Sequence, residues 1–338
     1  MGLRQAKKHS PAAFLGSISQ TSGLVKTLTA AAPSPTSPDL TPAIHRFNEL
    51  SDSALSLPIT TNETNITQKS LSHAIDLKSH RDLLSSTTDH RNRARLNSVS
   101  LPHAGEWLTV TPSPSLGLHL HPIEFRNSAL YRLGRPLFPG PSECPRCPQS
   151  NDEMGDHAVG CRSDGDRIAR HDRLRDAIFT AARTAALAPQ RELPNLIPGS
   201  QDRPADIYIG TWKRGRPAAF DVTVISPLQS STVKNAASEP SSALELATRR
   251  KRQSHDQDCH DAGIDFVPLP VETLGGWSAD AISTIKEIAR LAAQRSGQDP
   301  RAAPRHLLQR LGIILQRGNI SLWIRRIAVV PPHVDGVL

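Results

Sequence analysis

Three cysteines and one histidine stand close together near the middle of this chain, and their spacing restricts the local fold more than any other feature. Cys144 and Cys147 are separated by two residues, His157 and Cys161 by three, and nine residues lie between the two pairs. Each pair can place two ligand atoms on one turn of the backbone, as a tetrahedral metal site requires. We therefore expect one structural zinc ion here, because the protein would fill all four positions.

Cysteine usage also bears on the compartment. The chain has four cysteines, and only Cys259 lies far from the others. A secreted disulfide scaffold would distribute its cysteines along the chain, so metal binding in a reducing compartment is the better interpretation. No apolar run approaches the ~20 residues that span a bilayer, and the N-terminus lacks a secretory signal. We expect a nuclear or cytoplasmic protein that is neither secreted nor bound to a membrane.

The charge balance favours a polyanionic partner without requiring one. The formal net charge is +8, from 40 Lys and Arg against 32 Asp and Glu. Residues 164–187 are expected to form an amphipathic helix whose polar side is rich in arginine. Such a side is usually just solvated, and contact with phosphates is the alternative. The candidate nucleic-acid-binding residues are Arg167, Arg170, His171, Arg173 and Arg203.

The order of predicted elements indicates an α/β protein. Residues 1–40 are rich in Ser, Thr, Ala and Pro and are expected to be disordered, with a linker over residues 31–38. Residues 41–140 are expected to form a helical linker region, residues 141–163 the zinc knuckle, residues 164–328 an α/β domain and residues 329–338 a tail.

Within the α/β domain, three runs resemble strands: residues 192–197, 205–211 and 217–225. A polar turn containing glycine separates the second from the third, which predicts a hairpin. One further strand is expected over residues 264–269. Helices are expected over residues 241–262, 278–296, 303–317 and 321–327. This order predicts a mixed sheet flanked by helices.

Two aspartates in the predicted hairpin are the candidate catalytic residues. Asp206 begins the apolar run of one strand, and Asp221 lies inside the next, where an unpaired carboxylate is costly to bury. Side by side they could hold a divalent ion such as Mg²⁺, with Glu192 as a third ligand, for hydrolysis of a phosphodiester. The alternative is that both aspartates are ordinary strand-end or salt-bridged residues.

Phosphodiester hydrolysis also needs a cation near the reacting phosphate. Lys251 lies in a run of four basic residues, 249–252, and could reach back over the sheet; Lys234 in the preceding loop is the alternative. A basic run of this kind is more often a surface patch or a nuclear-import signal than a catalytic element.

Four segments, in this order, resemble the C-terminal part of non-LTR retrotransposon polyproteins that carry a restriction-like endonuclease. They are residues 155–161, 170–176, 203–206 and 220–224. Residues 96–108 also resemble that family's linker before the knuckle. In the family, a reverse transcriptase is followed by a Cys/Cys/His/Cys zinc knuckle and a nuclease of the PD-(D/E)xK type. The resemblance covers roughly residues 65–327.

The resemblance implies a restriction-endonuclease-like mixed sheet and a Mg²⁺-dependent endonuclease that nicks target DNA to prime reverse transcription. Asp206 and Asp221 would match the acidic metal ligands, and Lys251 the displaced catalytic lysine. DNA is the implied partner, and the element's RNA is a second candidate. An alanine is inserted between Pro204 and Asp206, and the 338 residues contain no Tyr/Phe-Ala-Asp-Asp polymerase motif. The alternatives are a non-catalytic zinc-containing nucleic-acid-binding module and a decayed retroelement fragment.

Overall fold

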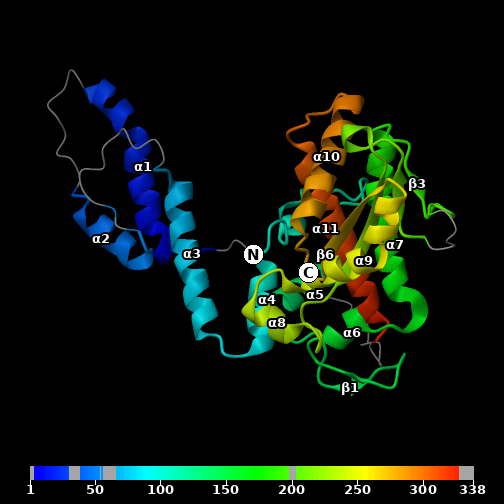
Figure 1. Ribbon diagram of the computed structural model, residues 1–338. Helices are drawn as coiled ribbons and strands as arrows, with labels where there is room; N and C mark the ends of the chain where they lie inside the picture. Colours follow the sequence, from blue (N-terminus) through cyan, green and yellow to red (C-terminus); the bar gives the residue numbers. More distant parts are fainter. Residues whose placement is uncertain (1–3, 30–38, 54, 56–65, 198–202, 327–338) are drawn as a thin grey trace. The chain divides into compact units, whose positions relative to one another are not determined.

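The computed structural model describes residues 4–29, 39–53, 55, 66–197 and 203–326 (Figure 1). The chain forms two compact units, Met1–Thr88 and Asp89–Leu338, and each is described separately. The second unit is a mixed α/β structure that contains two small sheets and the Cys/His cluster. Across the described residues, no helix is both long enough and apolar enough to span a membrane.

The first unit consists of three packed helices: α1 (Ala6–Thr29), α2 (Thr41–Leu50) and α3 (Gln68–Ser86). Pro42 occupies the first turn of α2, where no intrahelical partner exists for an N–H group. Thr67 caps α3, because its hydroxyl accepts a hydrogen bond from the Ser70 N–H at 3.1 Å. Buried side chains from all three helices form the core: Ala12, Leu15, Ile44, Phe47, Leu71 and Ile75.

The predicted disorder of residues 1–40 is wrong for helix α1. Large apolar residues are few there, but Ala12 and Leu15 are fully buried. Gly16 allows a close approach to α3, since a Cβ at Gly16 would lie 2.5 Å from the backbone nitrogen of Gln68. Because α1 packs against α3 through small residues, its sequence lacks the wide apolar stripe that marks an amphipathic helix. The predicted linker over residues 31–38 lies outside the described residues.

The second unit is built on a four-stranded sheet in the order β3, β4, β5, β6. The strands are β3 (Gln190–Arg191), β4 (Ile207–Ile209), β5 (Ala218–Ile225) and β6 (Asp265–Glu272). β4 is antiparallel to both β3 and β5, whereas β6 is parallel to β5. The predicted mixed sheet and the predicted hairpin are both confirmed.

Helices cover both faces of this sheet (Figure 1). They are α7 (Asp166–Thr184), α10 (Ala279–Ser296) and α11 (Ala303–Ile324) on one face and α9 (Ser242–Asp261) on the other. Side chains alternate along β5, so Phe220 and Val222 pack with α7, α10 and α11. Ala219 packs on the opposite side with Cys259 of α9. By the same alternation, Asp221 faces α9.

The second unit also contains shorter elements. They are α4 (His90–Val99), η1 (Glu106–Thr109), α5 (Pro122–Leu133), β1 (Ser142–Glu143), β2 (Ser150–Asn151), α6 (Asp156–Gly160), η2 (Ser163–Gly165), η3 (Lys213–Gly215) and α8 (Val233–Ser238). A second hydrophobic cluster joins α4, α5, α6 and α8 to the end of α11, and the rings of Tyr131 and Trp323 lie 4.9 Å apart within it. Residues 89–140, predicted as part of a linker, therefore belong to the second unit.

The strand predicted over residues 192–197 is wrong, because the strand there is β3 and it ends at Arg191. Two further elements differ from the prediction for physical reasons. β6 continues beyond residue 269 despite Pro268 and Pro270, because it pairs only with β5 and an edge strand tolerates missing N–H groups. α11 is one helix where two were predicted. Gly318 lies in its interior against the Arg170 side chain, where a Cβ would collide with the arginine stem.

Candidate functional site

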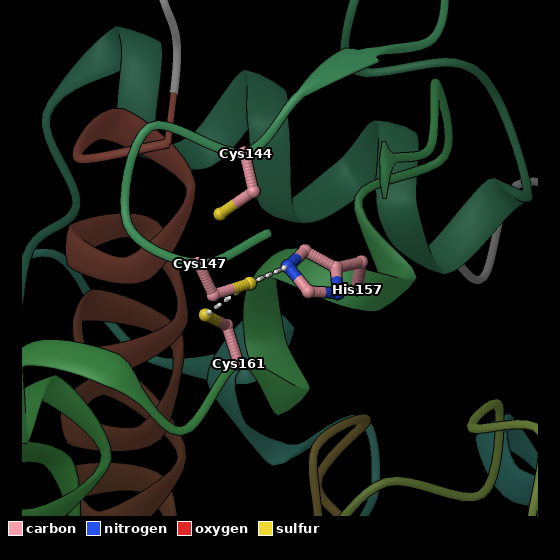
Figure 2. A group of neighbouring side chains, drawn as sticks. All are labelled: Cys144, Cys147, His157 and Cys161. Atoms are coloured by element: carbon pink, nitrogen blue, oxygen red, sulfur yellow. Dashed lines mark hydrogen bonds between the residues drawn. The ribbon is translucent and has the colours of Figure 1, made fainter. Parts of the chain in front are cut away.

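The cysteine and histidine ligands come from a short hairpin and the helix that follows it. Cys144 and Cys147 lie on the turn between β1 and β2, His157 lies in α6, and Cys161 directly follows α6. Figure 2 shows the four side chains converging on one point. Their ligand atoms lie within 4.8 Å of one another, and no other described group of three or more His, Cys, Asp or Glu residues does so. The predicted cluster is confirmed.

Distances within the cluster match a tetrahedral zinc site. Cys147 Sγ lies 3.8 Å from Cys161 Sγ and 3.4 Å from His157 Nε2. A zinc ion about 2.3 Å from each sulfur and about 2.0–2.1 Å from the nitrogen gives tetrahedral edges of about 3.8 Å and about 3.5 Å. Burial opposes ionisation of Cys161, but hydrogen bonds from Ser163 and Arg326 outweigh it and lower its pKa to about 7. The cluster can therefore hold a metal ion such as zinc.

Contacts around the cluster fix the positions of its ligands. The Asp152 carboxylate accepts hydrogen bonds from the backbone N–H groups of Asp156 at 3.0 Å and His157 at 2.6 Å, and so caps α6. The Gly155 carbonyl accepts a hydrogen bond from the Trp323 indole at 3.1 Å. Gly155 has a φ of 79°, and a Cβ there would lie 2.9 Å from the indole nitrogen. The ligand loop and α11 fit together because this residue is glycine.

Asp206 and Asp221 lie close together on the β4–β5 hairpin. The antiparallel register pairs Ile207 with Phe220, and Asp206 is the residue just before β4. The Asp206 N–H donates to the Phe220 carbonyl at 3.0 Å, so Asp206 stays beside the strand that carries Asp221. The two carboxylates interact, because Asp206 contributes to the raised pKa of Asp221. The prediction that the hairpin brings the two aspartates together is confirmed.

Asp221 is a buried carboxylate that Lys251 contacts from α9. Its side chain is only 8 % exposed, and Lys251 Nζ lies 3.2 Å from Oδ1 and 3.0 Å from Oδ2. Burial raises the pKa of Asp221 to about 6; Lys251 opposes this effect and Asp206 adds to it. The alternative lysine, Lys234, is exposed on α8 and forms no described ion pair with either aspartate. Of the two candidates, Lys251 is the one that reaches the carboxylate pair.

Asp206 is held by a histidine and by the sheet. Nε2 of His171, near the start of α7, lies 3.0 Å from Asp206 Oδ2, and the Val222 N–H donates to the same oxygen at 2.6 Å. Burial opposes ionisation of Asp206, but His171 and the N–H together lower its pKa. Burial also disfavours the charged form of His171, yet Asp206 and Asp172 raise its pKa to about 9. Each carboxylate therefore has a basic partner from a different helix.

Glu192, the remaining predicted residue of the acidic site, is next to Asp206 through its backbone, since its N–H donates to the Asp206 carbonyl at 3.2 Å. Glu192, predicted as a third magnesium ligand, forms ion pairs with Arg175 and, at 3.7 Å, with Arg203. Its side chain is 44 % exposed and belongs to no described ligand cluster. β3 ends at Arg191, so Glu192 follows the strand and lies at the sheet edge. The structure thus engages the Glu192 carboxylate with two arginines and not with the other predicted magnesium ligands.

A cleft of about 980 Å³ extends from the metal ligands to Lys251. Its walls come from the knuckle, the first turns of α7, the end of β5 with the loop after it, and α9. Of the predicted nucleic-acid contacts, Arg167 and Arg170 line this cleft. Arg173 is exposed and lines a different pocket, and Arg203 pairs with Glu192. The predicted basic helix face is therefore divided between two sides of the molecule.

Sequence reasoning did not identify the partners of two adjacent residues on α7. A nucleic-acid contact is predicted for His171, whereas in the structure its ring nitrogen Nε2 contacts the Asp206 carboxylate. Arg170 donates a hydrogen bond from Nη1 to the Asn319 side-chain oxygen at 2.8 Å. Asn319 is fully buried, and a lone amide between apolar residues of α11 is the one local signal that could have marked it.

The sequence was also compared with known proteins. No protein-family model matches the chain, and none of the curated proteins matches it. Its function is therefore inferred from the carboxylate pair, the cleft and the metal cluster.

Proposed function

We propose that the second unit is a divalent-cation-dependent endonuclease of the restriction-like type, with Asp206, Asp221 and Lys251 at its active site. The observation that carries this proposal is the convergence of three charged groups. Two interacting carboxylates lie on one hairpin, and a lysine ammonium lies 3.0 Å from one of them. Adjacent buried carboxylates oppose each other's ionisation, and such pairs with perturbed pKa values are concentrated at functional sites.

The donor set of the aspartate pair suits Mg²⁺. Both residues offer carboxylate oxygens, which hard divalent cations prefer, and no sulfur ligand lies among the described contacts of either carboxylate. Mg²⁺ held by Asp206 and Asp221 would supply positive charge to the phosphate and lower the pKa of the attacking water. The raised pKa of Asp221 supports this assignment, because Lys251 alone leaves the charge of this buried carboxylate incompletely compensated.

The basic side chains have separate roles in this proposal. Lys251 Nζ can turn from Asp221 toward the scissile phosphate and stabilise the negative charge that develops there. His171 keeps Asp206 ionised in the absence of a cation and must leave Oδ2 when one binds. The Val222 N–H holds the same carboxylate in orientation throughout. His171 is thus a positioning residue for Asp206.

The biological context is proposed from the sequence motifs. The order of knuckle, basic helix and hairpin aspartates is that of the retrotransposon family that this chain resembles. On that basis the substrate is target DNA, nicked so that a reverse transcriptase can extend the new end, and the element's RNA is a second candidate partner. The polymerase activity would have to come from sequence other than these 338 residues.

Nicking of supercoiled plasmid by the purified chain with Mg²⁺ tests the proposal. Wild type is compared with Asp221→Asn and Lys251→Met, and zinc content is determined on the same samples. Asp265→Asn is the matched control, since Asp265 is an exposed sheet aspartate 2.9 Å from Arg216. We expect nicking by wild type and the control only. A folded, zinc-loaded wild type that leaves the plasmid intact would refute the nuclease.

One observation favours a second candidate function, a non-catalytic nucleic-acid-binding module. Each aspartate already forms an ion pair with a basic side chain, so the two aspartates could have a structural role without a bound metal ion. This candidate predicts salt-sensitive binding of DNA or RNA that survives Asp206→Asn and Asp221→Asn together. The nuclease also predicts binding by the double variant, so only the plasmid assay separates the two.

A further inference from the structure

Arg170 is a buried cation without an acidic partner. Its side chain is 2 % exposed, and Nε has no hydrogen-bond partner in the part of the chain that the structure describes. Burial lowers its pKa to about 9, and the nearby Arg167 and Arg326 contribute to the decrease. Arg326 is equally buried, but it contacts Asp166 at 3.0 Å. Among described residues, Arg170 has no such carboxylate, and a buried unpaired charge is strongly unfavourable.

The position of Arg170 is fixed by two helices and the sheet. Its Nη1 donates to Asn319 Oδ1 at 2.8 Å, and Asn319 Nδ2 donates to the Thr273 carbonyl at 2.8 Å. Gly318 leaves room for the arginine stem where any side chain would collide with it. The side chain of a surface arginine rotates freely, whereas these contacts hold Arg170 in one conformation. The geometry is that of a preorganised guanidinium, which loses little entropy when it binds an anion.

Arg170 lines the same cleft that joins the metal cluster to Lys251. Arg162 and Arg167 lie on its side of the cleft, and Arg250 lies beside Lys251 on the α9 side. The two aspartates of the lining are already engaged, Asp152 as the cap of α6 and Asp156 in an ion pair with Arg91. The cleft therefore presents a net positive lining to any ligand that enters it.

The cleft is suited to phosphates rather than to bases. Its described lining includes no Phe, Tyr or Trp, so it offers no aromatic platform on which a base could stack. At about 980 Å³ it has the size of a large small-molecule pocket, which can enclose part of one strand but not a duplex. Arginine guanidinium is well matched to phosphate oxygens.

We propose that Arg170 is a fixed subsite for a backbone phosphate of one nucleic-acid strand, bound in the cleft between the metal cluster and Lys251. Arg167 assists it from the preceding turn of α7. The assignment of the ligand as a nucleic acid rests on the proposed function. The bound phosphate is the anionic partner that no described carboxylate provides for Arg170. Binding at this subsite is independent of base sequence, because contacts to phosphate carry no sequence information.

The test is the affinity of the full chain for a fluorescent single-stranded DNA, measured across salt concentrations without added divalent ion. Arg170→Gln removes the charge and retains a side-chain amide that can donate to Asn319. We expect about a tenfold loss of affinity and a decrease of about one in the slope of log affinity against log salt. Arg183→Gln is the matched control, because Arg183 is an exposed arginine of the same helix outside the cleft. It should change neither quantity appreciably.

Inorganic phosphate distinguishes a strand from a small phosphate ligand. At 10 mM it should compete only weakly with the DNA, because a strand has further contacts along the cleft. Complete displacement of the DNA by 10 mM phosphate would overturn the strand assignment. Equal affinity and equal salt slope for wild type and Arg170→Gln would overturn the subsite itself.

Folding of the variant is checked by tryptophan fluorescence and zinc content. Should Arg170→Gln fail to fold, Arg167→Gln carries the test, since Arg167 lines the cleft and is only partly buried. We expect the same direction of change, and an unchanged slope would overturn the proposal. The outcome is independent of nicking. A wild type that binds through Arg170 but does not cut refutes the nuclease alone, whereas one that cuts with no dependence on Arg170 refutes the subsite alone.

Discussion

Replacing Asp221 with asparagine should stabilise the second unit while abolishing nicking. Burial raises the pKa of this carboxyl from 3.8 to about 6. That difference is about 2 units, and each unit corresponds to about 1.4 kcal/mol, so ionised Asp221 destabilises the folded protein by roughly 3 kcal/mol. Asparagine has the same size and no charge. Allowing about 1 kcal/mol for imperfect hydrogen bonding of the new amide, we expect a net gain of about 2 kcal/mol.

The pH dependence of this gain follows from the direction of the pKa shift. Because the pKa is higher in the folded state, that state binds the proton more tightly. The destabilisation is absent below pH 3.8, grows as the pH rises and is complete above about pH 6. At pH 5 it is about half of its full value. The advantage of Asp221→Asn should therefore shrink by about 1.4 kcal/mol between pH 7.5 and pH 5.

Urea unfolding followed by tryptophan fluorescence measures this effect on the stability of the second unit, to which Asp221 belongs. All four tryptophans, at positions 107, 212, 277 and 323, lie in Asp89–Leu338. The control Asp265→Asn removes an exposed carboxylate and should change the free energy of unfolding by less than about 0.5 kcal/mol. A less stable Asp221→Asn variant, or one whose advantage increases on acidification, would refute the reasoning.

Three further predictions concern the metal cluster and the basic side chains. Cys161→Ser should lower the zinc content per purified chain and destabilise the second unit, whereas Cys259→Ser, outside the cluster, should retain zinc at the wild-type level. His171 has a folded pKa of about 9, above its ordinary 6.5, so its stabilisation is complete below pH 6.5 and lost as pH rises through 9. His171→Gln should therefore cost about 2–3 kcal/mol in urea unfolding at pH 6 and much less at pH 10, and a loss independent of pH would contradict this account. Arg91→Met leaves Asp156, which is 14 % exposed, without its ion-pair partner, so we expect a loss of about 3 kcal/mol and faster release of zinc to a chelator; an unchanged release rate would count against it.

The parts of the site that could be predicted from the sequence are those set by local geometry. The four metal ligands lie on one hairpin and the helix after it, so their spacing alone indicates the cluster. Asp206 and Asp221 belong to one hairpin, which its polar turn and apolar strands indicate in the sequence. The sequence offered Lys251 and Lys234 as alternative cations and the family resemblance pointed to Lys251, whereas the contact of Lys251 with Asp221 depends on how α9 covers the sheet.

What could not be predicted depends on contacts between distant segments and on buried polar groups. Helix α4 buries Asn97 and Ser98, which bond to the Ala236 carbonyl and to the Glu272 carboxyl. A helix that packs through amides and hydroxyls shows no apolar periodicity, so hydrophobic patterning passes over it. The pairing of His171 with Asp206 spans 35 positions and is equally invisible in the sequence.

Helix α11 connects the core of the sheet to the metal-ligand loop. It is packed at Leu308 in the core beneath the sheet and at Trp323 against the ligand loop. At 1.5 Å per residue, these positions are about 22 Å apart along the helix axis. Because both ends are packed, the helix keeps the ligand loop at a constant distance from the sheet core. One residue inserted between Leu308 and Trp323 would turn Trp323 by about 100° and remove its indole from the Gly155 carbonyl.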